Sequence, residues 1–238
     1  MKNKDEKELK KDQKKVNSKL KIIIIICIIV LIVAAGIILY AVYKNNQCVD
    51  IDYPSGVDKP IIYLYPEKKT ELSVKLGKPE NITCSYPKYN NEWNIIANTD
   101  GTLIDTNTGR KLYSLYWEGK QSVPVEFEDG FVVKKDDTVQ FLEEKLAILG
   151  LNETEAEEFI IYWLPKLQKN DYNYIRFATM DEINNNMPLY FSVEPDTIIR
   201  VLMQYKPLDH YIEVPEQKLE TPERKGFVAV EWGGTEIK

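Results

Sequence analysis

The feature that most constrains this chain is a run of 22 residues without a charged side chain, IIIIICIIVLIVAAGIILYAVY, at positions 22–43. A helix rises about 1.5 Å per residue, so this run spans about 33 Å as a helix. The hydrocarbon core of a bilayer is about 30 Å thick. We therefore expect a single transmembrane helix at 22–43, with the rest of the chain divided between the two sides of a membrane.

The charges that flank this run predict its orientation. Residues 1–21 contain nine lysines and four acidic residues, whereas Lys44 is the only charged residue between positions 43 and 50. The positive-inside rule places residues 1–21 in the cytoplasm and the C-terminal part outside. The Lys-rich head is shorter than the roughly 40 residues that a self-folding domain needs, and we expect it to attract anionic lipid.

A cleaved signal peptide is the alternative. Its apolar region would be about 7–15 residues long and would end at a small-residue cleavage site. Val33-Ala34-Ala35 would serve as that site, but mostly apolar residues continue beyond Gly36. The longer run favours an uncleaved signal anchor and a location in the cell membrane, with an extracytoplasmic C-terminal domain.

Composition restricts what the outer part binds. After residue 47 the chain has 21 basic and 33 acidic residues, a net charge of −12. Such an acidic surface argues against nucleic acid as a partner. Cys48 and Cys84 both fall on the outer side, where disulfides persist, so the sequence leaves open a bridge between them.

We divide the outer part into a linker at 44–58 and an α+β domain at 59–238. The linker contains Pro54 and Gly56, which are typical of loops. Short runs rich in Ile, Val and Tyr follow, and they predict an antiparallel β-rich domain. The expected strands are 60–65, 71–76, 82–86, 93–98, 102–105, 112–118, 173–179, 189–193, 198–205 and 227–232.

Two helices are expected as an insertion between these strands. In the first, 137–150, Asp137 and Gln140 match a capping box and Gly150 marks the end. In the second, Asn152 and Glu155 match the same box, and Pro165 ends or kinks the helix. Both segments have an apolar stripe, which predicts that they cover a sheet.

Two glutamates near strand ends are the candidate catalytic residues. In a strand at 112–118, Tyr113, Leu115 and Trp117 would share one face, with Tyr116 and Glu118 on the other. Glu231 would likewise lie on the face opposite its neighbouring Trp. If Glu118 and Glu231 met within about 5–10 Å, they would match the carboxylate pair of a glycoside hydrolase.

A structural role for these glutamates is the alternative, and we favour it. In that interpretation each Glu is a strand-end residue that pairs with a cation such as Arg110, Arg200 or Arg224. Tyrosines of the same strands suggest a second role, since exposed rings suit stacking on sugars; the candidates are Tyr63, Tyr65, Tyr86, Tyr89 and Tyr116. Tyrosine is also a routine strand residue that buries its ring and keeps its hydroxyl hydrated.

The sequence predicts no metal site and no cofactor. His210 is the only histidine, which excludes a His-rich zinc site and confines any Ser-His-Asp triad to Asp209 and His210. The acidic clusters at 126–129 and 136–137 lack the ligand spacing of a calcium loop.

Five segments carry a resemblance to known sequences: KPIIYLYPE, TCSYPKYNNEW, YSLYWEG, GLNETEAEEFIIYWLP and TPERKGFVAVEWGG. Together they resemble an uncharacterised family of bacterial extracytoplasmic domains with no established activity. The resemblance runs from about residue 59 to 234. It implies one family domain displayed behind varied membrane anchors, and it assigns no catalytic residue.

The sequence thus predicts a membrane-anchored extracytoplasmic binding or structural module that interacts with cell-wall glycan or a surface protein. Tyr116, Glu118 and Glu231 are the candidate ligand-binding residues. The alternative is a cell-wall-active glycoside hydrolase that uses Glu118 and Glu231.

Overall fold

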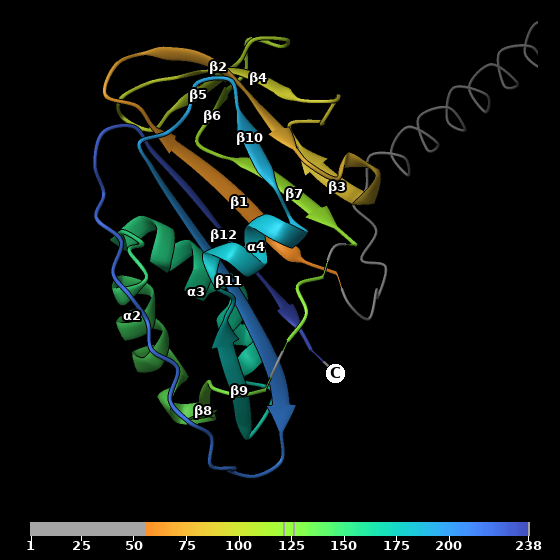
Figure 1. Ribbon diagram of the computed structural model, residues 1–238, viewed down its shortest axis with the longest axis vertical. Coiled ribbons are helices and arrows are strands. Elements are labelled where there is room, and N and C mark those ends of the chain that lie inside the picture. Colours follow the sequence, from red (N-terminus) through yellow and green to blue (C-terminus); the bar gives the residue numbers. More distant parts are fainter. Residues whose placement is uncertain (1–55, 121, 126, 238) are drawn as a thin grey trace, which may run out of the picture. The chain divides into compact units, whose positions relative to one another are not determined.

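Two β-sheets and three α-helices make up the part of the chain that this computed structural model describes, residues 56–120, 122–125 and 127–237 (Figure 1). The predicted α+β class is confirmed, with sheets that are mostly antiparallel. The expected membrane span at 22–43 lies outside the described residues. Within those residues, no helix is both long enough and apolar enough to cross a bilayer.

The larger sheet has seven strands in the order β3-β7-β1-β12-β11-β9-β8. Their bounds, in that order, are Ile82–Tyr86, Leu115–Gly119, Asp58–Tyr65, Val228–Glu236, Thr197–Leu208, Tyr172–Phe177 and Phe131–Lys134. Neighbouring strands are antiparallel except β11 and β12, which run parallel. Consecutive buried residues in β1 and β12 reflect a position at the centre of the sheet with both faces covered.

The smaller sheet has five strands in the order β10-β2-β4-β5-β6. Their bounds, in that order, are Leu189–Phe191, Thr70–Leu76, Trp93–Ala97, Leu103–Asp105 and Lys111–Leu112. Buried and less buried residues alternate along β2, β4 and β5. This period of two shows that one face of the small sheet packs inward while the other faces solvent.

The expected helical pair is confirmed as α2, Thr138–Ile148, and α3, Glu153–Leu167. Asn152 and Glu155 form the predicted capping box at the start of α3. Gly150 adopts φ +87°, and Leu151 N donates to Leu146 O at 3.1 Å to close the end of α2.

One detail of the helical prediction is wrong, and one of the two effects expected of Pro165 is excluded. Asp137 makes no capping hydrogen bond, because it already has helical dihedrals in the 3₁₀ turn Lys135–Asp137 that leads into α2. Pro165 does not end α3, which continues to Leu167.

Two elements have no counterpart in the predicted set. Strand β8 is four residues long. Helix α4, Met180–Asn186, is capped by Thr179 and Glu182, whose T-x-x-E spacing is the sequence signal that could have revealed it.

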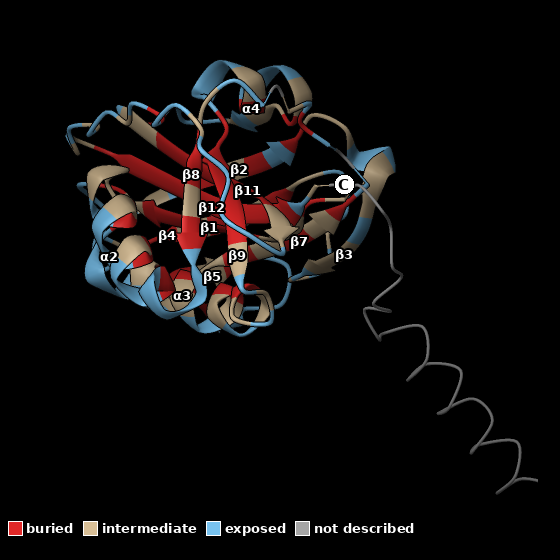
Figure 2. Cartoon of the chain, turned by 90° about the horizontal axis from the view of Figure 1, so that it is seen from below, coloured by how far each residue is buried: buried red, intermediate tan, exposed pale blue. Residues whose placement is uncertain are grey.

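The seven-stranded sheet separates two hydrophobic cores. We call the side covered by α2 and α3 the helix face, and the side covered by the five-stranded sheet and α4 the small-sheet face; Figure 2 shows α4 and the α2–α3 pair on opposite sides of the buried strands. On the helix face, the fully buried Phe159 and Trp163 of α3 pack with Trp232 of β12. Each large apolar side chain buried in this way contributes on the order of 1.5–3 kcal/mol.

Candidate functional site

Glu118 and Glu231 lie on opposite faces of the seven-stranded sheet. Ile62 of β1 pairs with Glu231 on one side and with Leu115 on the other, whereas Ile61 pairs with Tyr116. Directly opposed residues of antiparallel strands share a face, and successive residues alternate. Glu231 is therefore on the small-sheet face and Glu118 on the helix face. The backbone of the sheet separates the two carboxylates, so they do not flank one common site as the hydrolase alternative requires.

Glu231 is buried and ion-paired. Its side chain is 5% exposed, and its carboxylate lies 2.6 Å from the guanidinium of Arg200, which is 2% exposed. Arg200 Nε donates to Glu231 Oε2 at 2.7 Å, and Trp117 Nε1 donates to Oε1 at 3.0 Å. Both carboxylate oxygens are thus occupied by buried partners, as the structural interpretation expects. Among the arginines considered from the sequence, Arg200 is the partner.

The expected strand at 112–118 is divided between the two sheets. Leu112 belongs to β6 of the small sheet, whereas Leu115 begins β7 of the large one. The change of sheet at Tyr113 and Ser114 breaks the alternation. Tyr113 consequently does not share a face with Leu115; its ring lies on the helix face, 6.4 Å from the ring of Tyr63.

The helix face carries a group of tyrosines on β3, β7, β1 and the segment that leads into β7, which we call the tyrosine row. Its members are Tyr63, Tyr65, Tyr86, Tyr113 and Tyr116. Tyr63 stacks on Tyr65 with ring centroids 6.4 Å apart, and Tyr86 pairs with Tyr116 across β3 and β7. Tyr63 is buried, but Tyr86 is 48% and Tyr113 59% exposed. The tyrosine row thus contains a buried ring, that of Tyr63, and two exposed rings, those of Tyr86 and Tyr113.

Helix α3 lines the inner side of this row with polar side chains. Glu158 accepts a hydrogen bond from the Tyr63 hydroxyl at 2.6 Å. One turn further, Tyr162 accepts from Lys166 at 3.0 Å, and Lys166 forms an ion pair with Asp58 of β1 at 3.0 Å. Residues spaced by four lie on one side of a helix. The row therefore combines apolar rings with alternating acidic and basic groups.

The pKa values of the Tyr63 and Tyr116 hydroxyls are raised, so both hydroxyls remain protonated well into the alkaline range. Burial, followed by the hydrogen bond to Glu158, raises the pKa of Tyr63. Burial and a hydrogen bond with Glu118 raise the pKa of Tyr116 in the same direction. At neutral pH these hydroxyls are donors that the neighbouring carboxylates orient, so the charge in the row comes from its carboxylates and cations.

The remaining candidates lie apart from the row. Tyr89 belongs to the core on the small-sheet face, where its ring lies 4.8 Å from that of Trp93 in an edge-to-face contact. His210 is exposed. Cys84 is disulfide-bonded, but the predicted pairing with Cys48 falls outside the described residues and stays a prediction. Within the described ranges, no three potential metal-ligating side chains come together.

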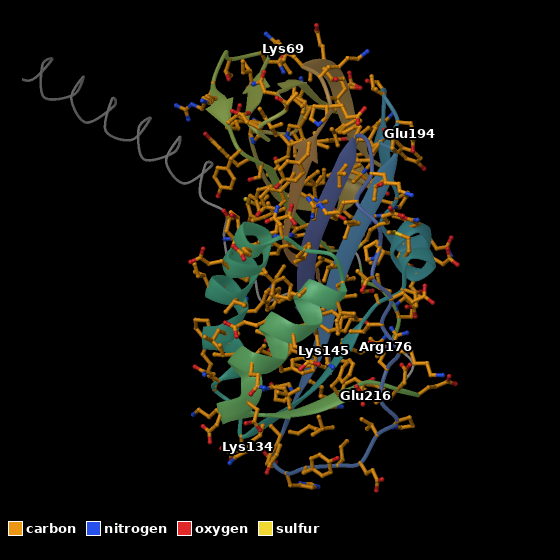
Figure 3. All side chains as sticks on the ribbon, turned by 90° about the vertical axis from the view of Figure 1, so that its left-hand side faces the viewer. Lys69, Lys134, Lys145, Arg176, Glu194 and Glu216 are labelled. Atoms are coloured by element: carbon orange, nitrogen blue, oxygen red, sulfur yellow. The ribbon has the colours of Figure 1, made fainter. Side chains whose placement is uncertain are left out.

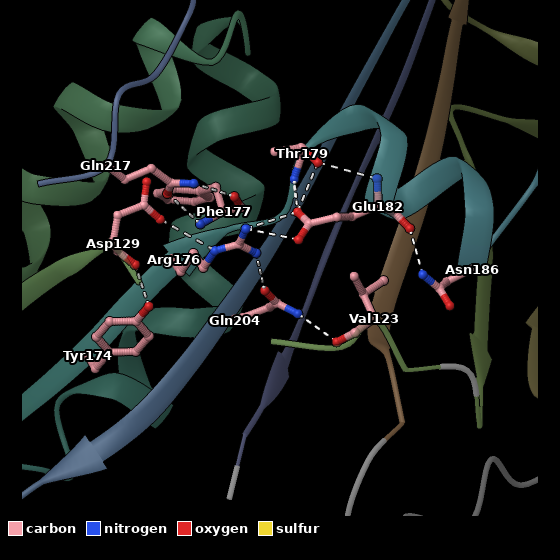
Figure 4. A network of polar contacts seen from close by, with 10 residues as sticks. All are labelled: Val123, Asp129, Tyr174, Arg176, Phe177, Thr179, Glu182, Asn186, Gln204 and Gln217. Carbon is pink, nitrogen blue, oxygen red and sulfur yellow. Dashed lines mark hydrogen bonds and ion pairs between the residues drawn. The ribbon is translucent and has the colours of Figure 1, made fainter. Parts of the chain in front are cut away.

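A buried polar network on the small-sheet face was not anticipated from the sequence (Figure 4). Arg176 of β9 donates to Gln204 at 3.0 Å and to both carboxylate oxygens of Glu182 at 2.9 and 3.1 Å. Gln204 in turn donates to Val123 O at 2.8 Å. These bonds fasten α4 and the segment around Val123 to the sheet. We therefore assign this network a role in stabilising the fold.

No family model matches this sequence, and no curated protein or solved structure is detectably similar to it.

Proposed function

We propose that this protein is a membrane-anchored, extracytoplasmic binding module, and that the tyrosine row binds a cell-wall polysaccharide without cleaving it. The observation that carries the proposal is the exposure of Tyr86 and Tyr113 on the face of the sheet that also bears the buried Tyr63 and the polar side of α3. A sugar ring offers an apolar face to an aromatic ring and hydroxyl groups at its edge. Binding sites that combine apolar surface with a few oriented polar groups suit such ligands.

The separation of Glu118 from Glu231 supports binding without turnover. Glycoside hydrolysis by the usual route needs two carboxyl groups that flank one bond. Glu118 lies beside Tyr116 on the helix face, whereas Glu231 is enclosed by Arg200 and Trp117 on the other. Glu118 therefore fits a hydrogen-bonding role toward ligand hydroxyls.

Co-sedimentation of the full-length chain, in detergent, with purified cell-wall sacculi tests this function. The variant is the double substitution Tyr86→Ala and Tyr113→Ala. Tyr190→Ala is the matched control, because Tyr190 is similarly exposed, at 55%, but lies on β10 of the small sheet. Loss of one stacked ring costs about 0.5–1.5 kcal/mol, which corresponds to up to roughly tenfold in affinity for each tyrosine.

We expect the wild type and Tyr190→Ala to sediment with the sacculi, the double variant to remain in solution, and the supernatant to contain no released sugar. Equal sedimentation of all three proteins would contradict a role for the tyrosine row. Failure of the wild type to sediment would instead favour a surface protein as the ligand. Sugar release that depends on Glu118 would restore the hydrolase alternative.

A further inference from the structure

A groove of ≈ 390 Å³ lies at the edge of the seven-stranded sheet opposite to the edge that carries the tyrosine row. Its walls are β8, the first part of α2, and residues 211–216, which we call the strap. Figure 3 shows where Lys145 of α2 and Glu216 of the strap approach one another. The lining residues are Gly130–Lys134, Asp137, Gln140, Phe141, Glu144, Lys145, Tyr211, Val214 and Glu216.

Strand β8 directs unpaired backbone groups into this groove. Gly130 N donates to Pro215 O at 2.9 Å and Gly130 O accepts from Gln217 N, so the polar groups of Gly130 point away from β9. Lys135 N, in contrast, donates toward β9, to Asp171 O. Because the direction alternates along a strand, the N–H and C=O of Val132 also point outward. Among the described residues, no backbone hydrogen bond joins Val132 to the strap.

An edge strand with free donors and acceptors readily accepts a further strand. At this edge the strap occupies the space beyond the groove, and it is anchored to β8 at Gly130. The groove of ≈ 390 Å³ between β8 and the strap has the size of a short peptide segment. The groove therefore suits one extended polypeptide segment better than the edge of a second copy of this chain.

The side chains around the groove indicate what that segment contains. The Phe131 and Phe141 rings contact each other edge to face, 5.2 Å apart, and supply an apolar floor. Lys145 lies 5.0 Å above Phe131, and its charge is shared by Glu144 at 2.9 Å and Glu216 at 3.6 Å. Among the residues that line the groove or adjoin its lining, acidic side chains outnumber lysines. The acidic residues are Asp136, Asp137, Glu143, Glu144, Glu213 and Glu216, and the lysines are Lys134, Lys135 and Lys145.

We propose that this groove binds an extended segment of a partner protein, which pairs with the backbone of Val132 as an eighth strand of the sheet. The segment has alternating apolar and basic side chains: the apolar ones face Phe131 and Phe141, and the basic ones face the carboxylates of α2 and the strap. This site is independent of the tyrosine row and of its ligand.

The test uses three synthetic peptides and the full-length chain in detergent. The first peptide has the sequence KVTVKVT, the second has its lysines replaced by glutamate, and the third is KVTVKVT with N-methyl groups on alternate amides, which removes its strand hydrogen bonds. Affinity is measured by fluorescence anisotropy. The protein variants are Val132→Pro, which removes one outward N–H, and Val132→Thr, which keeps it.

Proline is tolerated at Val132 because that N–H does not take part in pairing with β9. Hydrogen exchange of the Val132 amide is also measured in the wild type. This measurement reports on the same contact even if the Val132→Pro variant does not fold. We expect KVTVKVT to bind, to slow exchange at Val132, and to lose about tenfold in affinity on Val132→Pro, the upper range for one backbone hydrogen bond. Val132→Thr should bind as the wild type does, and the acidic and methylated peptides should bind more weakly.

Equal binding of the methylated peptide, or unchanged exchange at Val132 in the presence of KVTVKVT, would overturn the proposal. So would failure of KVTVKVT to bind at millimolar concentration. Analytical ultracentrifugation of the same samples addresses the other occupant: a wild-type dimer that dissociates on Val132→Pro would make a second copy the ligand and would also refute a partner peptide.

Discussion

Both faces of the seven-stranded sheet accommodate glutamate side chains, but the two faces do so with different hydrogen-bonding partners. On the helix face, Tyr63 and Tyr116 bring neutral hydroxyls against the carboxylates of Glu158 and Glu118, and two further rings reach solvent. On the small-sheet face, the charges of Arg200 and Glu231 are almost fully enclosed. The charges on the small-sheet face are buried and paired, whereas the polar groups of the helix face are partly exposed and hydrogen-bonded to tyrosine hydroxyls. The comparison shows that the more exposed of the two faces is the one on which we propose that ligand binds.

The largest expected effect is on the small-sheet face. Replacing Glu231 by Ala leaves the buried Arg200 guanidinium without its counter-charge, and removal of one partner of a buried pair costs about 3–5 kcal/mol. Glu118→Ala is the matched control on the helix face, where a partly exposed carboxylate contributes about 1 kcal/mol or less. Urea unfolding of the two variants measures the difference. Equal losses would show that burial does not distinguish the two glutamates.

A smaller effect, which depends on pH, is expected from Glu182 on the same face. Burial raises the pKa of Glu182, but the hydrogen bonds from Arg176 and Thr179 outweigh it and hold this pKa below its ordinary value. A lowered folded pKa adds stability that is present above the unfolded pKa, about 4.3, and is lost as the pH falls through the folded value.

Glu182→Gln should therefore destabilise the protein at pH 7, by about 1–2 kcal/mol, and the difference from the wild type should vanish in strong acid. Unfolding curves at a series of pH values measure it. A difference that persists unchanged below the folded pKa would mean that the charge of Glu182 does not contribute. Asp181→Asn, on the exposed side of the same helix, is the control.

The helix face should show the opposite dependence on pH. The pKa of Tyr116 is raised above 10, so the unfolded chain releases this proton before the folded protein does. Stability contributed by such a group is present below the unfolded pKa and declines as the pH rises above about 10. Tyr116→Phe should make this alkaline decline less steep than it is in the wild type. Tyrosinate absorbance during alkaline unfolding measures both proteins, and identical slopes would argue against a protected Tyr116 hydroxyl.

The smallest effect on stability is expected at the accessible rings of the helix face. Tyr113→Ala should change the free energy of unfolding by about 0.5 kcal/mol or less, as is usual for exposed positions. The same substitution should weaken the association with sacculi. A large loss of stability would mean that Tyr113 protects Tyr63 from solvent and belongs to the core, which would remove it from the candidate site.

Local signals in the sequence predicted much of the secondary structure. The apolar stripe and the Asn152–Glu155 box sufficed for α3, because both depend on residues within one turn of each other. The strand expected at 112–118 failed because its hydrophobic pattern is continuous although the chain changes sheets at Tyr113 and Ser114. No local pattern records that change, which depends on which distant strands lie beside each half.

The candidate site shows the same limit. The sequence placed Tyr116 and Glu118 on one face correctly, because they lie in one short strand. It left open whether Glu118 meets Glu231, since that depends on the pairing of β1 with both β7 and β12. The partner of Glu231 was open for the same reason: Arg200 reaches it through the parallel register of β11 and β12. Strand registers between distant segments, more than residue types, decide which side chains meet.

The position of β12 has a consequence for the order in which the protein assembles. This strand lies between β1 and β11 at the centre of the large sheet, although it is the last strand along the described chain. Until Val228–Glu236 has been synthesised, β1 and β11 each have an unpaired edge, because β12 is the strand that lies between them. Long-range pairing of this kind slows folding and leaves edges prone to aggregation. A released chain truncated before Val228 should therefore aggregate more readily, and bind chaperones more strongly, than one that contains Val228–Glu236.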